Sequence, residues 1–482
     1  MNKAIMLVIA LWLSCCTSLA LAQDAKAVLA AAAQAMGAGT LDTVVFSGSG
    51  TEYTVGQAFN GDSAWPKFIN KTYSRQIDFR TPATKLDRIR MQGENPPHGG
   101  GGQPVRGEQT QSQTVIVDAN TPWVQQLDIW LTPHGFLRAA AAAATATVKS
   151  QTVGGTRHNV VSFTGGNNAA VNGYINGDNI VERVETWIDN PVLGDLQFEA
   201  VYSDYRDFAG VKFPMHIVQR QGGFPTLDLA ISDVKPNAAV SIQPPARPAA
   251  PATTAAAPGL PTEKLADGVY LILGGYASVA IDFKDYIVVI EGSTNDARSN
   301  AVIAEAKRLI PNKPLRYLVN THHHFDHSGG LRAFVAEGAT IITHEINQPY
   351  YARVWRNPHT LNPDRLAMQP RAPVFETMTE MKVLTDGNHV VELHHLLGSD
   401  HNQGLIAAYL PKERILIEAD AFNPPGDKNA PVAQPPSPFT TNLVANLTRL
   451  KLDVQRIIPI HYPADGRVVD IAELNRAVAA AN

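Results

Sequence analysis

The sequence predicts a two-part α/β protein, in which a mostly antiparallel β domain precedes a layered domain of alternating strands and helices. Three observations support this. The Pro- and Ala-rich stretch "QPPARPAAPATTAAAPGLP" at 243–261 lacks apolar periodicity, which is typical of a linker between domains. Before it, short runs of alternating apolar and polar residues are separated by Gly, Asn and Asp. After it, apolar strand-like runs alternate with amphipathic helical runs.

The first 22 residues predict a secretory signal peptide. They contain one early lysine, an apolar run and the small-x-small ending Ala20-Leu21-Ala22. We therefore expect a periplasmic or secreted protein with no stable membrane span after cleavage. A buried first helix is one alternative. A lipoprotein signal is another, because Cys15 and Cys16 lie near the end of the run, although the residues before Cys15 fit a lipidation box poorly.

Composition excludes several kinds of chemistry. The chain has only two cysteines, and cleavage after Ala22 would remove both. The mature chain would then form no disulfide and offer no thiolate as metal ligand or nucleophile. The formal net charge of −4 gives no reason to expect a nucleic-acid partner.

The first domain is predicted over residues 24–242. "AKAVLAAAAQAMG" at 25–37 has helical spacing and stops at a glycine, and the Ala-rich stretch at 136–148 predicts a second helix. Runs such as "TVVFSGSGTEYTVG", "HNVVSFTG" and "LDLAISDVK" predict antiparallel strands in a curved sheet or half-barrel. The Gly-rich segment 93–111 predicts a mobile loop, and His98 within it is interpreted as a solvated residue.

The strand pattern and the stretch "DYRDFAGVKFPMHIV" resemble the lipoprotein-carrier half-barrel domains of bacterial envelopes. This resemblance implies an apolar groove that takes a lipid-like ligand. A passive accessory domain is the alternative.

The second domain is predicted over residues 262–482. Three apolar strands, "GVYLILGG", "ASVAIDF" and "YIVVIEG", precede the amphipathic helix "NDARSNAVIAEAKRLIP". Next come the strand "RYLVNTH", the helix "GGLRAFVAEG" and the strand "TIITHE". Four more strands run from "MKVLTDG" to "RILIEADAF", and the helix "TNLVANLTRLKLD" and the strand "RIIPIHYP" follow. This order predicts sheets flanked by helices.

The run "THHHFDH" is the main chemical feature of the sequence. It follows the predicted strand "RYLVN", so it lies on a loop at a strand's carboxyl end, where sites in layered α/β proteins collect. His322 and His324 are two residues apart and can point the same way, and Asp326 and His327 follow at once. Neutral imidazoles and a carboxylate suit Zn²⁺ or another divalent first-row metal ion. A solvated His-rich turn is the alternative for this run taken alone.

Three further candidate ligands lie downstream. His401 sits in a Gly-flanked loop before an apolar strand, and Asp420 and His461 each follow an apolar strand. Singly, each fits an ordinary turn residue or a packed core histidine. Together, residues of ligand type at several strand ends predict one shared site.

This combination resembles the metallo-β-lactamase superfamily over residues 265–465. The resemblance rests on the His-x-His-x-Asp-His run, the later histidine, the strand-end aspartate and the final strand-end histidine. It implies a four-layer αβ/βα sandwich with a dinuclear metal site between two sheets. It also implies the ligands: His322, His324 and His401 for one ion, Asp326, His327 and His461 for the other, and Asp420 as the bridge.

The remaining acidic and histidine positions carry weaker expectations. Glu291 stands where the family usually has an aspartate that supports the site, and a carboxylate one methylene longer is compatible with that role. His323 is expected to point away from the metals. His344 is interpreted either as a packed residue or as a contact of a ligand or substrate. His394 and His395 lie inside a strand and receive no role.

The resemblance implies a hydrolase with two divalent ions, first of all zinc, with iron or manganese as alternatives. The ions would share a hydroxide nucleophile, and Asp326 would be the catalytic residue that orients it and moves its proton. Asp420, rather than Cys or Ser, favours hydrolysis of a small-molecule ester, thioester or lactone over a true β-lactamase. A lactam or phosphodiester substrate and a periplasmic carrier of a lipid-like ligand stay as alternatives.

Two further features are left open by the sequence. The segment 347–370, with Tyr350, Tyr351 and Trp355, fits either a pocket mouth or a packed helical lid. The sequence does not indicate the oligomeric state.

Overall fold

The structure is a computed structural model that describes residues 24–94, 97–244 and 259–479. The predicted signal peptide lies outside the described residues, as do residues 245–258 of the predicted linker. Within the described residues, the helices are too short or too polar to cross a membrane.

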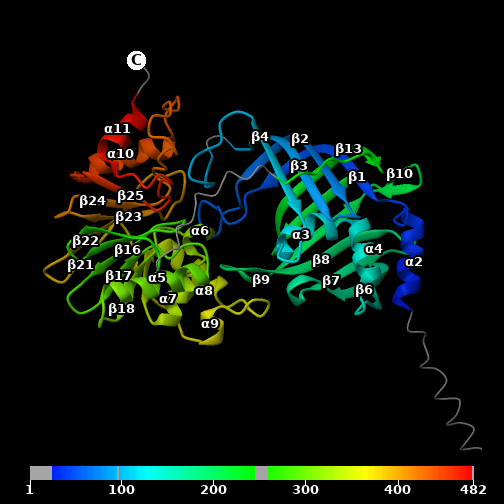
Figure 1. Cartoon of the computed structure of the whole chain (residues 1–482), viewed down its shortest axis with the longest axis horizontal. Helices are drawn as coiled ribbons and strands as arrows, with labels where there is room; N and C mark the ends of the chain where they lie inside the picture. The colour runs from blue at the N-terminus through cyan, green and yellow to red at the C-terminus, as the bar shows by residue number, and fades with distance from the viewer. Residues whose placement is uncertain (1–23, 95–96, 245–258, 480–482) are drawn as a thin grey trace, which may run out of the picture.

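The first domain is built on one antiparallel sheet of eleven strands, in the order β4-β3-β2-β1-β13-β12-β9-β8-β7-β6-β5. Figure 1 shows this sheet curving around the helices of the domain. The curved antiparallel sheet matches the prediction, whereas helix α3 was not predicted. The strands are β1 (Thr43–Tyr53), β2 (Lys67–Asp78), β3 (Ala83–Gln92), β4 (Gln109–Ile116), β5 (Thr147–Val153), β6 (Thr156–Thr164), β7 (Ala170–Ile175), β8 (Val181–Asn190), β9 (Gly194–Ser203), β12 (His216–Gln221) and β13 (Phe224–Pro236), with a separate hairpin of β10 (Arg206–Phe208) and β11 (Val211–Phe213).

The three helices are α2 (Ala25–Met36), α3 (Trp123–Trp130) and α4 (Pro133–Ala142). Helix α2 matches its prediction, because Asp24 caps its start and Gly37, at φ 68°, ends it in the left-handed conformation. The prediction of a helix over 136–148 is wrong at its end. Helix α4 stops at Ala142, and the β-branched residues from Thr147 onward join strand β5 instead.

The second domain contains two facing sheets. One has seven strands, β14 (Thr262–Ala266), β15 (Val269–Ile272), β16 (Ser278–Asp282), β17 (Ile287–Ile290), β18 (Leu315–Val319), β19 (Thr340–His344) and β20 (Val374–Met378). The other has six, β21 (Met381–Thr385), β22 (Val390–His395), β23 (Ile406–Leu410), β24 (Ile415–Glu418), β25 (Arg456–Pro459) and β26 (Val469–Asp470). The helices are α5 (Asp296–Leu309), α6 (Phe325–Ser328), α7 (Leu331–Glu337), α8 (Gln348–Val354), α9 (Arg365–Met368), α10 (Pro438–Leu450) and α11 (Ile471–Val478).

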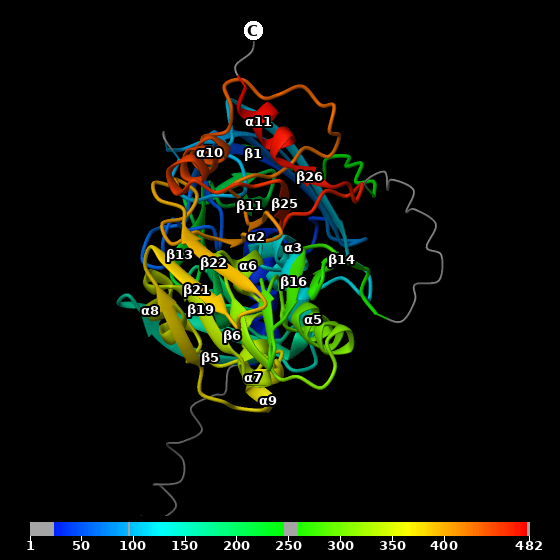
Figure 2. The same cartoon turned by 90° about the vertical axis from the view of Figure 1, so that its left-hand side faces the viewer.

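These elements form the predicted four layers. Helices α5 and α7 contact the seven-stranded sheet, and α10 and α11 lie at the other end of the domain against the six-stranded sheet (Figure 2). Strand β17 shows why the sheets are buried on both faces. Ile287 and Val289 pack toward the helices, whereas Val288 and Ile290 pack between the two sheets. A continuous apolar strand is therefore the expected sequence for this position.

The two domains share a packed boundary. One cluster of buried apolar side chains continues from the first domain into the second. On one side of the boundary, the Asp195 carboxylate accepts hydrogen bonds from the backbone and hydroxyl of Thr360, and Asn357 donates to the Leu193 carbonyl. On another side, the connections after β1 and β3 reach across to the second domain near α6 (Figure 1).

Candidate metal centre

The seven predicted ligands meet at one edge of the two facing sheets. His322 and His324 follow β18, and Asp326 and His327 lie in the short helix α6 that comes next. The other three lie next to separate strands: His401 precedes β23, Asp420 follows β24 and His461 follows β25. Strands β24 and β25 are parallel, so their carboxyl ends meet at the same edge.

The first group of donors consists of His322, His324, His401 and Asp420, whose ligand atoms all lie within 4.8 Å of one another. The Nε2 atoms of His322 and His401 are 3.2 Å apart. Both face Oδ2 of Asp420, at 3.5 Å and 3.3 Å. All four residues are buried, so this group lies away from solvent.

The second group consists of Asp326, His327, His461 and the same Asp420, again within 4.8 Å. Nε2 of His327 lies 2.8 Å from Asp420 Oδ2, and Nε2 of His461 lies 3.0 Å from Asp420 Oδ1. Oδ2 of Asp326 lies 3.4 Å from His327 and 3.6 Å from His461. The Asp420 carboxylate is therefore shared by both groups, as a bridging ligand requires.

The charges of the site favour bound cations. Burial and the neighbouring imidazoles hold the pKa of His322 and of His324 well below the usual value, so both rings are neutral and able to bind a metal ion. Burial also lowers the pKa of His327, but Asp326 and Asp420 raise it well above its usual value. The carboxylates of the half-buried Asp326 and the buried Asp420 thus favour positive charge at this point, and divalent cations would supply it. The donor set fits a dinuclear site of His and Asp ligands.

Glu291 supports two of the ligands from behind. It is fully buried, and its Oε2 accepts a hydrogen bond of 2.6 Å from the Thr321 hydroxyl and one of 3.4 Å from Nδ1 of His327. Because the Thr321 proton points to Glu291, the Thr321 oxygen accepts from Nδ1 of His322 at 3.1 Å. Once bound metal ions replace the proton of His327 as the positive charge, both rings would present an unprotonated Nε2 to the site. The longer side chain of Glu291 is compatible with the supporting role.

Backbone strain accompanies this arrangement. Glu291 has φ 76° and Asp420 has φ 59°, in the left-handed region that side-chain-bearing residues rarely adopt. Both residues come directly after buried strands, so the packed sheets hold them in this conformation.

Two supporting side chains were not predicted from the sequence. The Tyr276 hydroxyl donates to Oδ2 of Asp326 at 3.0 Å, and its ring lies 4.5 Å from that of His461. Asn423 donates to Oδ1 of Asp420 at 3.1 Å. Asn423 is only three residues from the predicted ligand Asp420, and this short distance in the sequence could have identified it as a supporting residue. Tyr276 lies in a turn 50 residues before Asp326 and carries no such signal.

The other histidines lie outside the two groups. His323 points away from them, as expected, and one of its ring nitrogens is 2.9 Å from the Asn402 amide. His344 is a packed residue, because its ring lies 4.2 Å from that of His395 and its Nδ1 accepts from the Ile346 backbone. His98 is half-exposed and lies 3.7 Å from Asp400, consistent with a loop residue that is no ligand.

The segment 347–370 combines the two roles that the sequence left open. Tyr351 is fully buried and donates to Asn320 Oδ1 at 2.6 Å, so this part of the segment is packed. Tyr350 and Arg353 line a cavity of about 80 Å³ at the domain boundary, together with His323.

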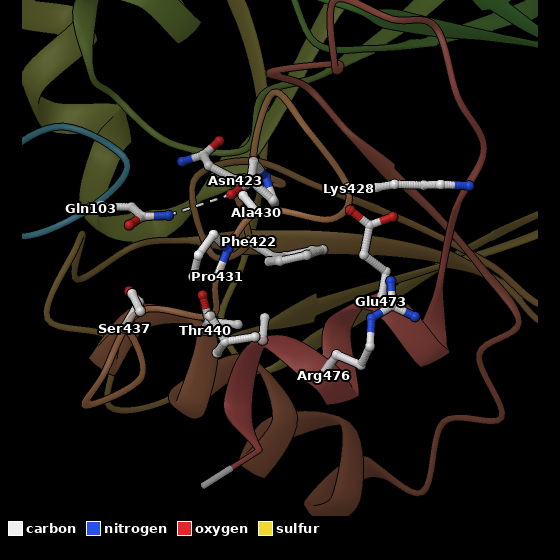
Figure 3. A pocket seen from close by; sticks show the side chains of 14 residues that line it. Gln103, Phe422, Asn423, Lys428, Ala430, Pro431, Ser437, Thr440, Glu473 and Arg476 are labelled. Carbon is white, nitrogen blue, oxygen red and sulfur yellow. Dashed lines mark hydrogen bonds between the residues drawn. The ribbon is translucent and has the colours of Figure 1, made fainter. Parts of the chain in front are cut away.

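A second cavity, of about 160 Å³, is lined by residues that follow Asp420 in the chain, including Phe422 and Asn423. Figure 3 shows its side chains: Gln103 comes from the first domain, and the remaining residues come from the second. Asn423 lines this cavity and also donates to Asp420, which connects the cavity to the metal centre. Gln103 in turn donates to the Asn423 carbonyl.

Comparisons with known proteins agree with this geometry. Residues 273–461 match the family model described as Metallo-beta-lactamase superfamily. A curated relative is the 2,4-dinitroanisole O-demethylase subunit alpha of Nocardioides sp. (strain JS1661), 24% identical over 166 residues, which are 34% of this chain. The match spans 46% of that protein, or about half of its length.

Solved structures that resemble the chain include metallo-β-lactamases from Pontibacter korlensis and Hirschia baltica. The first is 18% identical over 45% of this chain and 97% of its own, with a TM-score of 0.35. The second is 19% identical over 46% and 96%, with a TM-score of 0.34. The family match and the His/Asp ligand set lead to one conclusion. The C-terminal half of this chain is a metal-dependent hydrolase domain of the metallo-β-lactamase superfamily.

Proposed function

We propose that the protein hydrolyses an ester, thioester, lactone or lactam bond of a small molecule, with two divalent metal ions in its second domain. The observation that carries the proposal is the shared carboxylate of Asp420, around which two complete groups of donors assemble. Zinc suits the His-rich donor set, and iron and manganese are the alternatives.

The residues of the site fit general acid–base catalysis at a hydrolytic centre. Bound metal ions would supply Lewis acidity at the carbonyl oxygen and lower the pKa of the attacking water. Burial raises the pKa of Asp326, but His327 outweighs this effect and holds the pKa far below its usual value, so the carboxylate is ionised. Asp326 then accepts a proton as the water oxygen bonds to the carbonyl carbon, and returns a proton to the leaving oxygen, sulfur or nitrogen as its bond to carbon breaks.

The exposure of the ligands indicates how the substrate reaches the centre. The side chains of His461 and Asp326 are 31% and 25% exposed, whereas those of His322 and His401 are fully buried. The substrate therefore approaches from the side of the second group. The cavity of about 160 Å³ that Asn423 lines would hold a part of the substrate away from the reacting bond.

The class of bond is proposed from the bridging residue. At the position of Asp420, the true zinc β-lactamases have Cys or Ser instead of aspartate, or else have altered neighbouring ligands. The presence of Asp420 therefore favours esters, thioesters and lactones over β-lactams as substrates. The curated relative is named as an O-demethylase subunit that acts on 2,4-dinitroanisole, so an aryl methyl ether belongs among the compounds to test.

The signal-like first 22 residues support a periplasmic or secreted location. Sequencing the amino terminus of protein purified from a native-like host tests this. A mature chain that starts after Ala22 supports the location, and a retained amino terminus contradicts it.

Metal content tests the hydrolase proposal first. We expect about two metal ions per chain by mass spectrometry, and fewer in both His324→Ala and Asp420→Ala, because each variant removes a donor. The metal-loaded protein is then assayed on a lactone, a thioester, an aryl ester, a β-lactam, a phosphodiester and an aryl methyl ether. A protein that takes up no metal from excess Zn²⁺, Fe²⁺ or Mn²⁺ contradicts the proposal.

A further inference from the structure

The first domain extends two connections over the metal centre of the second. One joins β1 to β2 and the other joins β3 to β4, and Figure 1 shows the first domain extending toward α6 of the second domain there. Gly102, in the second connection, accepts a hydrogen bond of 3.0 Å from Asn423 through its carbonyl. A Cβ at Gly102 would lie 2.6 Å from Oδ1 of Asp420, so the backbone of the first domain approaches the bridging ligand directly.

The first connection contacts His324 through a backbone carbonyl. The oxygen of Ala58 lies 2.8 Å from Nε2 of His324, and a carbonyl oxygen only accepts, so Nε2 carries the proton. The other ring nitrogen, Nδ1, is buried and has no hydrogen-bond partner among the described residues. Nδ1 is therefore the metal-binding atom of His324, and Ala58 fixes the tautomer that exposes its lone pair.

The same connection contacts Asp326 through a side chain. The Gln57 amide donates from Nε2 to Oδ1 of Asp326 at 2.9 Å. Tyr276 of the second domain donates to Oδ2, the oxygen that faces His327 and His461. Gln57 and Tyr276 therefore hold the two oxygens of one carboxylate, one from each domain, and fix the orientation of its plane.

Backbone packing holds this connection on the ligand loop. The Phe325 N–H donates to the Gly56 carbonyl at 3.2 Å. Gly56 has φ 78°, and a Cβ there would lie 2.3 Å from the Phe325 ring, so only glycine fits. The Gln57 carbonyl in turn accepts from the Gly100 N–H at 2.9 Å, which joins the two connections to each other.

We propose that residues 56–58 of the first domain are part of the metal centre, with Gln57 and the Ala58 carbonyl as positioning groups for Asp326 and His324. The first domain is then required for full metal affinity in the second, rather than being an independent carrier or a passive attachment. This role rests on the proposed dinuclear centre and assigns a part of it to a different domain.

The test uses full-length variants and metal affinity as its readout. In Gln57→Ala, we expect the weaker of the two metal sites to lose about 10-fold to 100-fold in affinity, measured by competition with a chromophoric chelator. The visible absorption of the cobalt-substituted protein should change as well, because the Asp326 carboxylate is free to rotate. Asn60→Ala is the matched control: it removes another hydrogen bond between the domains, to Gln403, that touches no ligand. We expect its affinity to stay within about threefold of the wild type.

A second pair of variants tests the backbone contact. Gly56→Ala should displace residues 56–58 and weaken metal binding at least as much as Gln57→Ala. Gly107→Ala introduces a residue at a similar φ, 62°, but with open space around it, and should bind both ions normally. Circular dichroism confirms that each variant is folded.

The outcomes separate this role from the dinuclear centre itself. If Asp420→Ala loses metal but Gln57→Ala and Gly56→Ala bind both ions with wild-type affinity and an unchanged cobalt spectrum, the role of residues 56–58 is refuted and the centre stands. If the wild type binds no metal, the proposed function fails together with this role.

Discussion

His134 in the first domain and His327 in the second are both fully buried, but the charges around them differ. The His134 ring stacks on that of Phe213 with centroids 5.8 Å apart, and its Nε2 contacts the Met36 carbonyl oxygen. Burial lowers its pKa to about 4, so the ring is neutral. His327 lies between Asp326 and Asp420, which raise its pKa despite burial. A buried imidazole is thus a structural residue in one domain and a candidate metal ligand in the other, according to whether carboxylates surround it.

The largest expected effects come from removing each ring. His327→Ala should lose at least about 100-fold in metal affinity. The loss of a residue that only supports a ligand costs about 10-fold to 100-fold, and the loss of a ligand itself should cost more. His134→Ala should leave metal affinity unchanged and lower the free energy of unfolding by about 2 kcal/mol or more through the cavity it creates. Chelator competition and urea unfolding measure the two quantities. A loss of metal affinity in His134→Ala would contradict the assignment of His134 as a purely structural residue.

The pH dependence of the free energy of unfolding tests whether His134 is neutral in the folded first domain. The pKa of His134 is about 4 in the folded chain and about 6.5 when unfolded. Below pH 6.5 the unfolded state binds a proton that the folded state does not, so stability is full above pH 6.5 and is lost as pH falls toward 4. The loss attributable to His134 is about 3 kcal/mol.

This pH effect is measured as the difference between the wild type and His134→Phe, followed by tryptophan fluorescence. Four of the five tryptophans after residue 24 lie in the first domain, so the signal reports mainly on that domain. The free energy of unfolding of His134→Phe should depend less on pH between 6.5 and 4 than that of the wild type. His98 is half-exposed, so His98→Ala should show the same pH dependence as the wild type. Equal slopes for wild type and His134→Phe would contradict the assignment.

Glu291 provides a test of intermediate size. Glu291→Gln keeps the shape of the side chain but removes the charge that holds Nδ1 of His327 and the Thr321 hydroxyl. We expect metal affinity to fall by about 10-fold. Glu305→Gln is the matched control, because Glu305 is also buried but pairs with Arg308 on helix α5. Equal metal affinities for the two variants would show that Glu291 has no supporting role.

The smallest expected effect concerns Tyr276. Tyr276→Phe removes one hydrogen bond to Oδ2 of Asp326 and keeps the ring against His461. The net contribution of a typical hydrogen bond is about 0.5–1.5 kcal/mol, and Gln57 still holds the other oxygen of Asp326. We therefore expect kcat to fall by about 2-fold to 10-fold with KM little changed. Tyr286→Phe, in which the ring stacks on Phe283 away from the site, serves as the control. A change confined to KM would place Tyr276 in substrate binding instead.

The sequence by itself determined the second domain and its ligands. The central strands of this domain are buried on both faces, so they are continuous apolar runs, and several of the predicted ligands follow the ends of such strands. Such signals are local and need no knowledge of contacts. Strands β2 and β3 were missed because polar residues break up their apolar pattern: Asn70 and Arg75 are buried in β2, and Arg88 and Arg90 are half-buried in β3.

Only the tertiary structure decided how the centre is completed. Gln57 reaches Asp326 across 269 residues of sequence, and Ala58 acts through its backbone, which no side-chain pattern can reveal. The same holds for His134, whose neutral state follows from the aromatic and apolar groups packed around it. Periodicity records which face of an element is buried, but not which element from another domain lies against it. The role of the first domain at the metal centre is therefore a property of the folded chain.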